Sequence, residues 1–377
     1  MSDKPDVVVV GGGVIGLSCA WSLRRRGLAV TLLEWRTCGS GASGASLGVL
    51  MPAPATRRGA FQTLQRQSLQ EFPDWAQALR DRTGIDPRYR RSGLLEVIPG
   101  EGRRQQAVGE SRIACSTWPA VDDAPVMAVL DAAGATALEP QIAFQEYGGR
   151  LCRTTANVDV ARLIDALRAV CVADGVEVQE NCAVHDLEVR DGRVRGVVLA
   201  DRRLAAGTVL VTAGAWTAQV SPLLAAHAPM RPVRGQALRL RAPGAAFTRI
   251  IKQRGIYLIP DVDGTVIVGA TTEAESGFNA RPTAHGIAEV TAAALALAPV
   301  LADAEVIQTW AGLRPESATG HLVLGPVADV NGLYIAAGHY KTGIGLAPLT
   351  GRVMAAWIAE GEPGIEVAAF APGPAAG

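Results

Sequence analysis

The sequence predicts an α/β protein in which a domain with a parallel sheet is interleaved with an α+β domain built on an antiparallel sheet. Two β-branched runs, Val7–Val10 and Thr208–Val211, each lead into a glycine turn and a helix, as buried strands of a parallel sheet do. The dipeptides Asp191-Gly192 and Asp263-Gly264 each separate two apolar-rich runs, which indicates an antiparallel hairpin. The chain has 377 residues, which is enough for two domains.

The first strand, turn and helix follow a nucleotide-binding pattern. Three glycines show the G-x-G-x-x-G spacing directly after the strand: Gly11, Gly13 and Gly16. Such glycines allow a tight turn, a close backbone approach to a pyrophosphate, and close packing of the helix on the sheet. The helix expected at 14–26 would direct its N-terminal N–H groups, beginning at Val14 and Ile15, toward the phosphates.

An acidic residue completes this pattern. The strand expected at 29–33 ends at Glu34, where a carboxylate accepts ribose hydroxyls and repels a 2′-phosphate. These residues alone leave both FAD and NAD open. The tract Cys38–Pro52, rich in Gly, Ala and Ser, follows immediately. A flexible linker has a similar composition, but this position favours contact with the dinucleotide and its ring system.

The rest of the chain reads as alternating helices and strands. Helices are expected at 61–83, broken near Pro73, as short pieces within 102–140, and at 158–174, 284–301 and 346–360. Strands are expected at 92–99, 176–179, 184–190, 193–200, 236–241, 249–252, 255–260, 265–270, 306–314 and 332–338. We assign 1–80, 150–220 and 320–365 to the nucleotide-binding domain, and 81–149 and 221–319 to the substrate-binding domain.

Composition narrows the function. The chain has 36 basic and 36 acidic residues, so we expect no nucleic-acid partner. Six scattered cysteines and five histidines without metal-ligand spacing lead us to expect reduced thiols and no metal site. No apolar window of about eighteen residues indicates an integral membrane segment. The residues Met1–Asp6 do not resemble a signal peptide, and we therefore expect a cytoplasmic protein.

Four segments of the C-terminal third carry a family resemblance: Tyr257–Pro260, Val268–Thr271, Trp310–Pro315 and Ala337–Tyr340. Their order and spacing resemble those of the D-amino-acid-oxidase-like flavoproteins, and most closely the glycine oxidases of bacterial thiamine biosynthesis. The resemblance extends over about 7–359. It implies FAD rather than NAD, and the absence of cysteine between Arg314 and Tyr340 implies non-covalent attachment.

The resemblance also implies roles for individual residues. Arg314 corresponds to the clamp for the substrate carboxylate, and Tyr257 to a hydroxyl donor to the same group. Lys341 replaces the arginine that glycine oxidases usually carry, which exchanges a planar fork for a point charge. Thr272 stands where a larger apolar residue is expected, so the size of the substrate site is open. The residues expected around the substrate are Arg314, Tyr257, Lys341, Val49, Met51 and Thr272.

For the FAD, the resemblance places Val184 at the adenine and residues 338–345 at the pyrimidine edge of the flavin. Trp35 stands at the adenosine end, where a small or basic residue is more usual. We expect His339 to bond backbone rather than to move protons. The residues expected around the FAD are Gly11, Gly13, Val14, Ile15, Gly16, Glu34, Trp35, Ala42, Ser43, Leu47, Gly48, Val49, Val184, Gly214, Trp216, Gly338, His339, Tyr340, Lys341, Thr342, Gly343, Ile344 and Gly345.

The expected reaction is FAD-dependent oxidative deamination of glycine, sarcosine or small D-amino acids. Hydride transfer to flavin N5 needs orientation and no protein base, which agrees with the lack of a catalytic triad or paired carboxylates. We expect reoxidation by oxygen, hydrogen peroxide as product, and a homo-oligomer. Two alternatives stay open: a D-amino-acid dehydrogenase that reduces a quinone or a partner, and a flavin-binding subunit of a larger amine-oxidising complex.

Overall fold

A six-stranded sheet carries the amino-terminal motif. In the computed structural model, which describes residues 4–373, its order is β18-β19-β12-β1-β2-β8. All neighbours are parallel except β18 and β19. The strands are β1 (Val7–Val10), β2 (Val30–Leu33), β8 (Glu177–Gln179), β12 (Thr208–Val211), β18 (Val323–Pro326) and β19 (Leu333–Ala337). The pairing of β1 with β12 confirms that the chain returns to this sheet after about two hundred residues.

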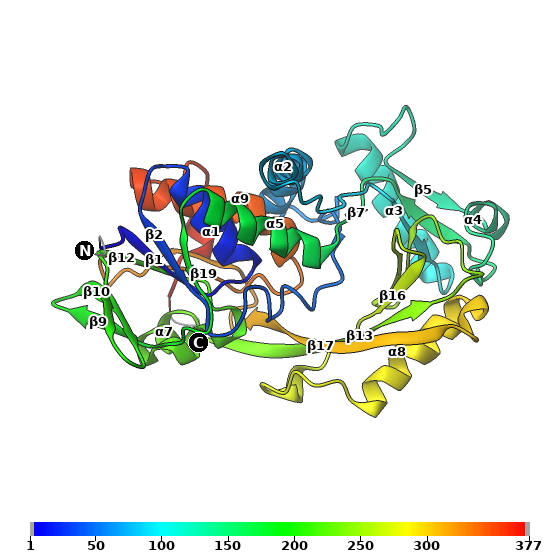
Figure 1. The fold of residues 1–377 in the computed structure, drawn as a ribbon. Coiled ribbons are helices and arrows are strands. Elements are labelled where there is room, and N and C mark those ends of the chain that lie inside the picture. The colour runs from blue at the N-terminus through cyan, green and yellow to red at the C-terminus, as the bar shows by residue number, and fades with distance from the viewer. Residues whose placement is uncertain (1–3, 374–377) are drawn as a thin grey trace.

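Helices cover one face of this sheet. Figure 1 shows α1 (Val14–Arg24), α5 (Val160–Ala173) and α9 (Gly343–Glu360) side by side over the strands, with α2 (Ala60–Thr83) beyond them. Alternate β1 residues such as Val7 and Val9 pack into that layer, whereas Val8 and Val10 pack on the opposite face. The opposite face is covered by a three-stranded sheet of β9 (Val184–Arg190), β10 (Arg193–Leu199) and β11 (Arg203–Ala205), and by α7 (Pro222–His227).

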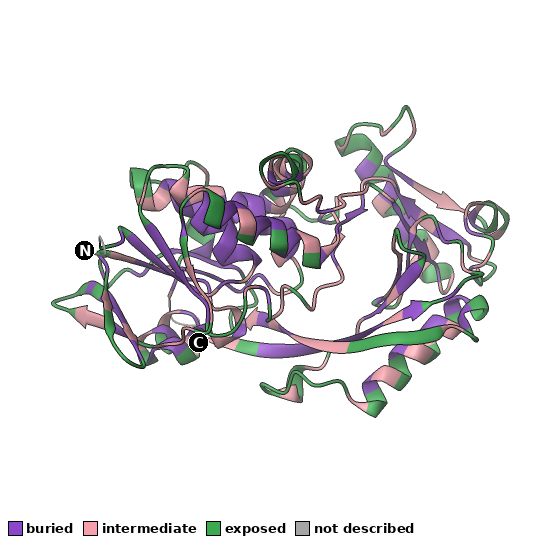
Figure 2. Cartoon of the chain, in the orientation of Figure 1, coloured by how far each residue is buried: buried purple, intermediate pink, exposed green. Residues whose placement is uncertain are grey.

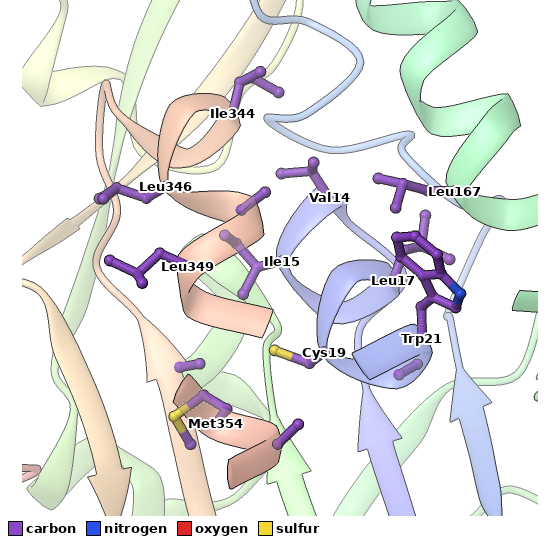
Figure 3. Packing of buried hydrophobic residues seen from close by; sticks show 14 of the residues in the cluster. Val14, Ile15, Leu17, Cys19, Trp21, Leu167, Ile344, Leu346, Leu349 and Met354 are labelled. Atoms are coloured by element: carbon purple, nitrogen blue, oxygen red, sulfur yellow. The ribbon is translucent and has the colours of Figure 1, made fainter. Parts of the chain in front are cut away.

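The helix α1 lies between α9 and α5. Figure 3 shows Ile15 on the side of α1 that faces α9, and Trp21 on the opposite side, near Leu167 of α5. The helix axes approach closely because α9 presents Gly351 to α1. The hydroxyl of Ser18 in α1 donates to the carbonyl of Ala347 over 2.7 Å, which ties the two helices together. This contact joins segments from the two ends of the chain and places the N-termini of α1 and α9 near each other.

An eight-stranded sheet forms the second half of the molecule. Its order is β17-β13-β16-β15-β14-β4-β6-β5, and all neighbours are antiparallel except β14 and β4. The strands are β4 (Leu94–Val97), β5 (Met127–Leu130), β6 (Gly149–Cys152), β13 (Met230–Arg241), β14 (Ile250–Gln253), β15 (Ile256–Pro260), β16 (Thr265–Gly269) and β17 (Glu305–Ser317). β13 and β17 are long strands that extend from this sheet toward α7 (Figure 1).

Helices flank the second sheet. α8 (Ala284–Leu297) packs on one face, while α3 (Glu101–Thr117) and α4 (Ala132–Leu138) lie near the β4–β5 end. The outer end of β17, Glu305–Thr309, is exposed, in contrast to the buried strands of the first sheet (Figure 2). The remaining elements are β3 (Val49–Leu50), β7 (Ala156–Asn157), α6 (Thr217–Val220) and the 3₁₀ turns Gly214–Trp216, Ala274–Ser276, Pro299–Leu301 and Ala368–Phe370.

Several element predictions need correction. α2 is one continuous helix through Pro73, because a proline removes one hydrogen bond while Leu64, Phe72 and Leu79 keep the helix buried on its neighbours. The 102–140 stretch contains one long helix, α3, and the unpredicted strand β5 instead of short helices only. Small buried residues, Ala107 and Ala114, form the packing stripe of α3, and this stripe gives a weak hydrophobic period.

Other boundaries also differ from the prediction. β13 and β17 are longer than expected because they pair with each other along their whole length, whether or not their outward residues are apolar. α9 begins at Gly343 rather than at 346. The division into a nucleotide-binding domain and a substrate-binding domain, with the boundaries given above, remains a prediction. Within residues 4–373, none of the helices combines the length and apolar character that crossing a membrane requires.

Candidate functional site

A cavity of about 780 Å³ lies where the two sheets meet. Its walls come from the β1–α1 turn, the 39–51 tract, the inner faces of β13, β15 and β17, and the turn before α9. Three of the predicted site residues do not line it: Gly16, Gly48 and Gly338. These glycines lie behind the wall. A Cβ on Gly16 would approach the Gly11 carbonyl oxygen to 1.9 Å, so this position accepts only glycine at the helix–sheet contact.

The dinucleotide end is built on Gly11, Gly13 and Glu34. Gly11 has φ +109°, and a Cβ there would lie 2.7 Å from the Thr212 carbonyl oxygen, so the turn requires glycine. The Glu34 carboxylate accepts the Gly12 N–H over 2.6 Å and the Arg36 N–H over 3.0 Å. Burial raises the pKa of Glu34, while these two N–H groups oppose the rise. The acid is therefore held rigidly beside the cavity.

The beginning of α1 fits a diphosphate. The first turn of the helix contains no acidic residue, and Gly13 and Val14 line the cavity there. The Ser43 hydroxyl accepts the Val14 N–H over 3.0 Å, which fixes the small-residue tract against the helix N-terminus. Ala42 and Leu47 from the same tract line the cavity. This cradle of glycines, free N–H groups and small side chains is the surface that an extended dinucleotide needs.

Aromatic side chains mark the adenosine end. The rings of Trp35 and Trp216 lie 5.5 Å apart, and Phe278 lies 5.7 Å from Trp216. The Arg36 guanidinium lies 4.1 Å from the Trp35 ring centroid. Val184 lines the cavity beside these rings, as does Gly214. Phe278 was not expected from the sequence, because the loop that carries it contacts Trp216 only through the tertiary fold.

The turn before α9 forms the opposite wall. Tyr340, Thr342, Gly343, Ile344 and Gly345 line the cavity, and the first turn of α9 contains no acid. A helix N-terminus in this position favours negative charge in the cavity. We expected the side chain of His339, the residue before Tyr340, to bond backbone, and this expectation is wrong.

His339 is almost wholly buried, with 4% of its surface exposed. Its Nε2 lies 3.1 Å from the Thr350 hydroxyl on α9, so its partner is a side chain and not backbone. The fold brings α9 back over the turn, which a local reading of the loop does not reveal. Burial lowers the pKa of His339 to about 3, and the ring is therefore neutral at physiological pH.

The end of the cavity where we expect the substrate centres on Arg314 of β17. Its Nη1 donates to the carbonyls of Thr271 over 3.1 Å and Arg234 over 3.3 Å. The guanidinium lies against Gly235 of β13, where a Cβ would be 2.1 Å from Nη2. Burial lowers the pKa of Arg314, and no carboxylate of the described chain lies within 4.0 Å. A half-buried guanidinium that faces a cavity, with no carboxylate of the described residues within 4.0 Å, is suited to binding an anion.

Lys341, Thr272 and Tyr257 complete this end. The Lys341 ammonium donates to the Thr272 hydroxyl over 3.3 Å and lies 5.2 Å from the Tyr340 ring centroid. Burial, followed by repulsion from Arg314, lowers the pKa of Lys341. Burial also raises the pKa of Tyr257, so its hydroxyl stays a hydrogen-bond donor. Val49 and Met51 line the same part of the cavity.

The lining residues that were not predicted from the sequence include Gln65, Gly235, Lys252 and Gly312. Gln65 donates to the Met51 carbonyl over 3.0 Å and thereby fixes the small-residue tract. Gly312 admits Ala45, whose Cβ would lie 2.4 Å from a Cβ at 312. Lys252 could have been found, because the tight turn after it pairs it directly with Tyr257 and so places both side chains on one face.

Comparisons with known proteins agree with this geometry. Residues 6–357 match the protein family described as FAD dependent oxidoreductase. Glycine oxidase from Pseudomonas aeruginosa is 34% identical over 377 aligned residues, with 99% of this chain and 99% of that protein covered. The crystal structure of glycine oxidase from Geobacillus kaustophilus has a TM-score of 0.91 at 28% identity and covers 99% of this chain and 100% of its own. Iminodiacetate oxidase from Chelativorans sp. BNC1 has a TM-score of 0.87 at 30% identity, with 98% and 100% covered.

Proposed function

Because the chain belongs to the FAD-dependent oxidoreductase family, we propose that it deaminates glycine, sarcosine or a small D-amino acid and passes the electrons to oxygen, with hydrogen peroxide as product. The cofactor is FAD and the reaction class is amino acid oxidation. Arg314 is the observation that supports the proposal most directly, since it offers a half-buried charge in the cavity to the carboxylate that all three substrates share.

The chain's own residues position the substrate. FAD supplies the acceptor for the hydride that leaves the substrate's α-carbon. Arg314 binds the carboxylate, and the Tyr257 hydroxyl donates to the same group from the neighbouring wall. Lys341 and the N-terminus of α9 favour negative charge on the opposite side. These groups thus orient the α-carbon of the substrate without forming a bond to it.

The amine must be neutral before hydride leaves, and the site favours this form electrostatically. Lys341 and Arg314 place positive charge beside the substrate nitrogen, which lowers the pKa of a bound ammonium group. The carboxylate and the histidines that line the cavity in the described residues are not placed for this task. Glu34 lies at the dinucleotide end, His185 follows Val184 at the adenosine end, and His339 is bonded to Thr350. The proton therefore leaves to water.

A substrate panel tests the proposal. Purified protein with FAD would be assayed by a peroxide-coupled reaction with glycine, sarcosine, D-alanine and D-proline. Iminodiacetate joins the panel because the relative from Chelativorans carries that substrate in its name. We expect turnover of at least one small amine without any added partner. Turnover only with a further protein would instead favour the subunit of an amine-oxidising complex.

Reoxidation of the reduced flavin by oxygen distinguishes the oxidase from the dehydrogenase alternative. Anaerobic reduction with the best substrate, followed by admission of air, should return the oxidised flavin spectrum within seconds to minutes. Reduced flavin that persists in air and is reoxidised by a soluble quinone would replace the oxidase proposal with the dehydrogenase. A cytoplasmic location and a homo-oligomeric state remain predictions from the sequence.

The clamp makes the first residue-level prediction. Arg314→Ala should lower kcat/KM at least about 100-fold while FAD stays bound, since a charge-assisted bidentate contact contributes about 3 kcal/mol when desolvated. Arg231→Ala is the matched control, because Arg231 lies on the neighbouring strand but is 59% exposed and paired with Glu316. Equal kinetics in the Arg314 variant and the wild type would remove the clamp assignment.

A further inference from the structure

We infer that the substrate of this site carries a second carboxylate, and that Lys252 binds it. The inference rests on the proposed function, because it concerns the same cavity and the same α-carboxylate at Arg314. It adds a substrate class: amino acids with a further acid group, attached either through the nitrogen or through the side chain. Three observations support it: the position of Lys252 on its strand, the pairing of the charges next to it on the sheet, and the small number of lysines in the chain.

The sheet register directs Lys252 into the cavity. Lys252 pairs directly with Tyr257 on one side and with Glu96 on the other, so the three side chains share one face of the sheet. The Lys252 ammonium lies 5.6 Å from the Tyr257 ring centroid, and both residues line the cavity. A substrate whose α-carboxylate contacts Arg314 and Tyr257 therefore has Lys252 next to Tyr257 along the wall.

The Lys252 ammonium forms no close ion pair in the described structure, and the carboxylates that attract it, Glu96 and Glu110, act at longer range. Glu96, its neighbour in register, is bound by Arg103 over 2.9 Å and by Arg150 over 2.5 Å. No carboxylate of residues 4–373 lies within 4.0 Å of the Lys252 ammonium. The carboxylate next to it is therefore already neutralised by two guanidinium groups, and the ammonium turns toward the cavity.

The substrate half of the cavity consequently has an excess of positive charge. Arg314, Lys341 and Lys252 all line it, and Glu34, the acid in the lining, is at the other end. Lys341 is repelled by both Arg314 and Lys252, which places the three cations within electrostatic reach of one another. One carboxylate offsets one of these charges, and the Lys341 ammonium donates to the Thr272 hydroxyl. A second carboxylate is the complement of the charge that remains.

The use of lysine in this chain supports the same conclusion. The protein has 36 lysines and arginines, but its lysines are only Lys4, Lys252 and Lys341. Surface cations are thus almost all arginine, whereas two of the three lysines line this one cavity. The lysine ammonium is a compact point charge with three N–H donors, which suits contact with a single carboxylate oxygen.

Unreactive isosteres test the inference by binding alone. Diglycolate replaces the nitrogen of iminodiacetate by oxygen, and methoxyacetate does the same for sarcosine, so the two probes differ by one carboxylate. Titration of the FAD-loaded protein, followed by the flavin absorbance spectrum, gives both dissociation constants. We expect diglycolate to bind about 10- to 100-fold more tightly than methoxyacetate, as a charge-assisted contact predicts.

Two variants locate the effect. Lys252→Met should bring the ratio of the two dissociation constants close to one. Arg254→Met should preserve it, because Arg254 lies two residues away in the same hairpin but is exposed and outside the cavity lining. A ratio that survives Lys252→Met overturns the inference. If that variant does not retain FAD, the wild-type protein decides: a ratio of one or below, together with no preference for D-aspartate over D-alanine, overturns the inference.

Kinetics then identify where the second carboxylate is attached. The ratio of kcat/KM for iminodiacetate over sarcosine reports attachment through nitrogen, and the ratio for D-aspartate over D-alanine reports attachment through the side chain. We expect at least one of the two ratios to fall about tenfold or more in Lys252→Met. Failure of every amine to reduce the flavin would refute the proposed function, whereas reduction by monocarboxylates with no effect of Lys252 would refute only the inference.

Discussion

At the scale of single residues, Arg314 depends on a glycine of the adjacent strand. A Cβ on Gly235 would lie 2.1 Å from Nη2 and 2.5 Å from Cζ of Arg314, so any side chain at 235 displaces the guanidinium. The carbonyls of Thr271 and Arg234 that hold Arg314 then no longer meet its Nη1 in the same geometry. Gly235 is thus a positioning residue for Arg314, the proposed carboxylate clamp.

Gly235→Ala should therefore raise KM more than it lowers kcat. A displaced guanidinium loses about 1–2 kcal/mol of carboxylate binding, which corresponds to about a 5- to 30-fold increase in KM. Gly244→Ala is the control, because no atom lies within 4 Å of a Cβ at Gly244. Steady-state kinetics and the flavin spectrum give both readouts. If Gly235→Ala loses FAD rather than substrate affinity, the glycine serves the fold and not the clamp.

His339 makes the folded protein sensitive to mild acid. Its pKa is lowered from 6.5 to about 3 by burial, so the unfolded state takes up a proton at a pH where the folded state does not. The stabilisation from neutral His339 is complete above pH 6.5 and is lost as the pH falls toward 3. Between pH 7 and pH 5.5 this linkage lowers the free energy of unfolding by about 1 kcal/mol.

Denaturant unfolding at pH 7 and pH 5.5 measures this loss. His339→Gln should show less of it, since glutamine keeps a polar partner for Thr350 but does not titrate. The exposed His285 provides the control, and His285→Gln should behave as the wild type does. An identical pH dependence in His339→Gln and wild type would show that burial of this ring does not set the acid sensitivity.

At the scale of elements, the contact between α1 and α9 brings the two ends of the chain together. A Cβ on Gly351 of α9 would lie 2.4 Å from the Ser18 hydroxyl and 2.7 Å from the Ser18 carbonyl oxygen of α1. Both helices begin at the cavity, one at the dinucleotide end and one at the turn before α9. Their close approach therefore sets the distance between two walls of the site.

Gly351→Ala should lower the free energy of unfolding by about 1–3 kcal/mol, because the added methyl group separates two packed helices. Gly109→Ala in α3 is the opposite case: nothing lies within 4 Å of a Cβ there, and replacement of a helical glycine stabilises by about 0.5–1 kcal/mol. Thermal melts of the two variants should therefore shift in opposite directions. A shift in the same direction would contradict the packing argument.

At the scale of the whole molecule, FAD joins parts that the chain connects only at a distance. The cavity is lined by the β1–α1 turn, the 39–51 tract, the inner strands of the eight-stranded sheet and the turn before α9. A ligand that touches all of these walls stabilises their arrangement, because it binds the folded state and not the unfolded one.

FAD at about one hundred times its dissociation constant should raise the free energy of unfolding by about 2.7 kcal/mol over the FAD-free protein. Thermal melts of protein stripped of flavin and then reloaded provide the measurement. FMN at the same concentration is the control, because it lacks the adenosine half that Glu34 and Trp35 are expected to contact. An equal shift with FMN would contradict the extended placement of the dinucleotide.

The sequence by itself determined the parallel and antiparallel halves of the fold, the glycine turn, and the part of the cavity wall formed by the β1–α1 turn, Glu34 and the 39–51 tract. These features depend on spacing within contiguous residues, and such spacing survives without knowledge of the fold. The family resemblance added Arg314, Tyr257 and the turn at 338–345, which local patterns do not single out.

Only the tertiary structure decided what the remaining residues do. Lys252 became a cavity cation because its strand pairs with the strand of Tyr257, and Gly235 became the support of Arg314 because β13 pairs with β17. His339 bonds Thr350, and α2 continues through Pro73, because packing with distant segments outweighs local preference. Contacts between segments far apart in the chain follow from how the elements pack, and that packing has no local signature in the sequence.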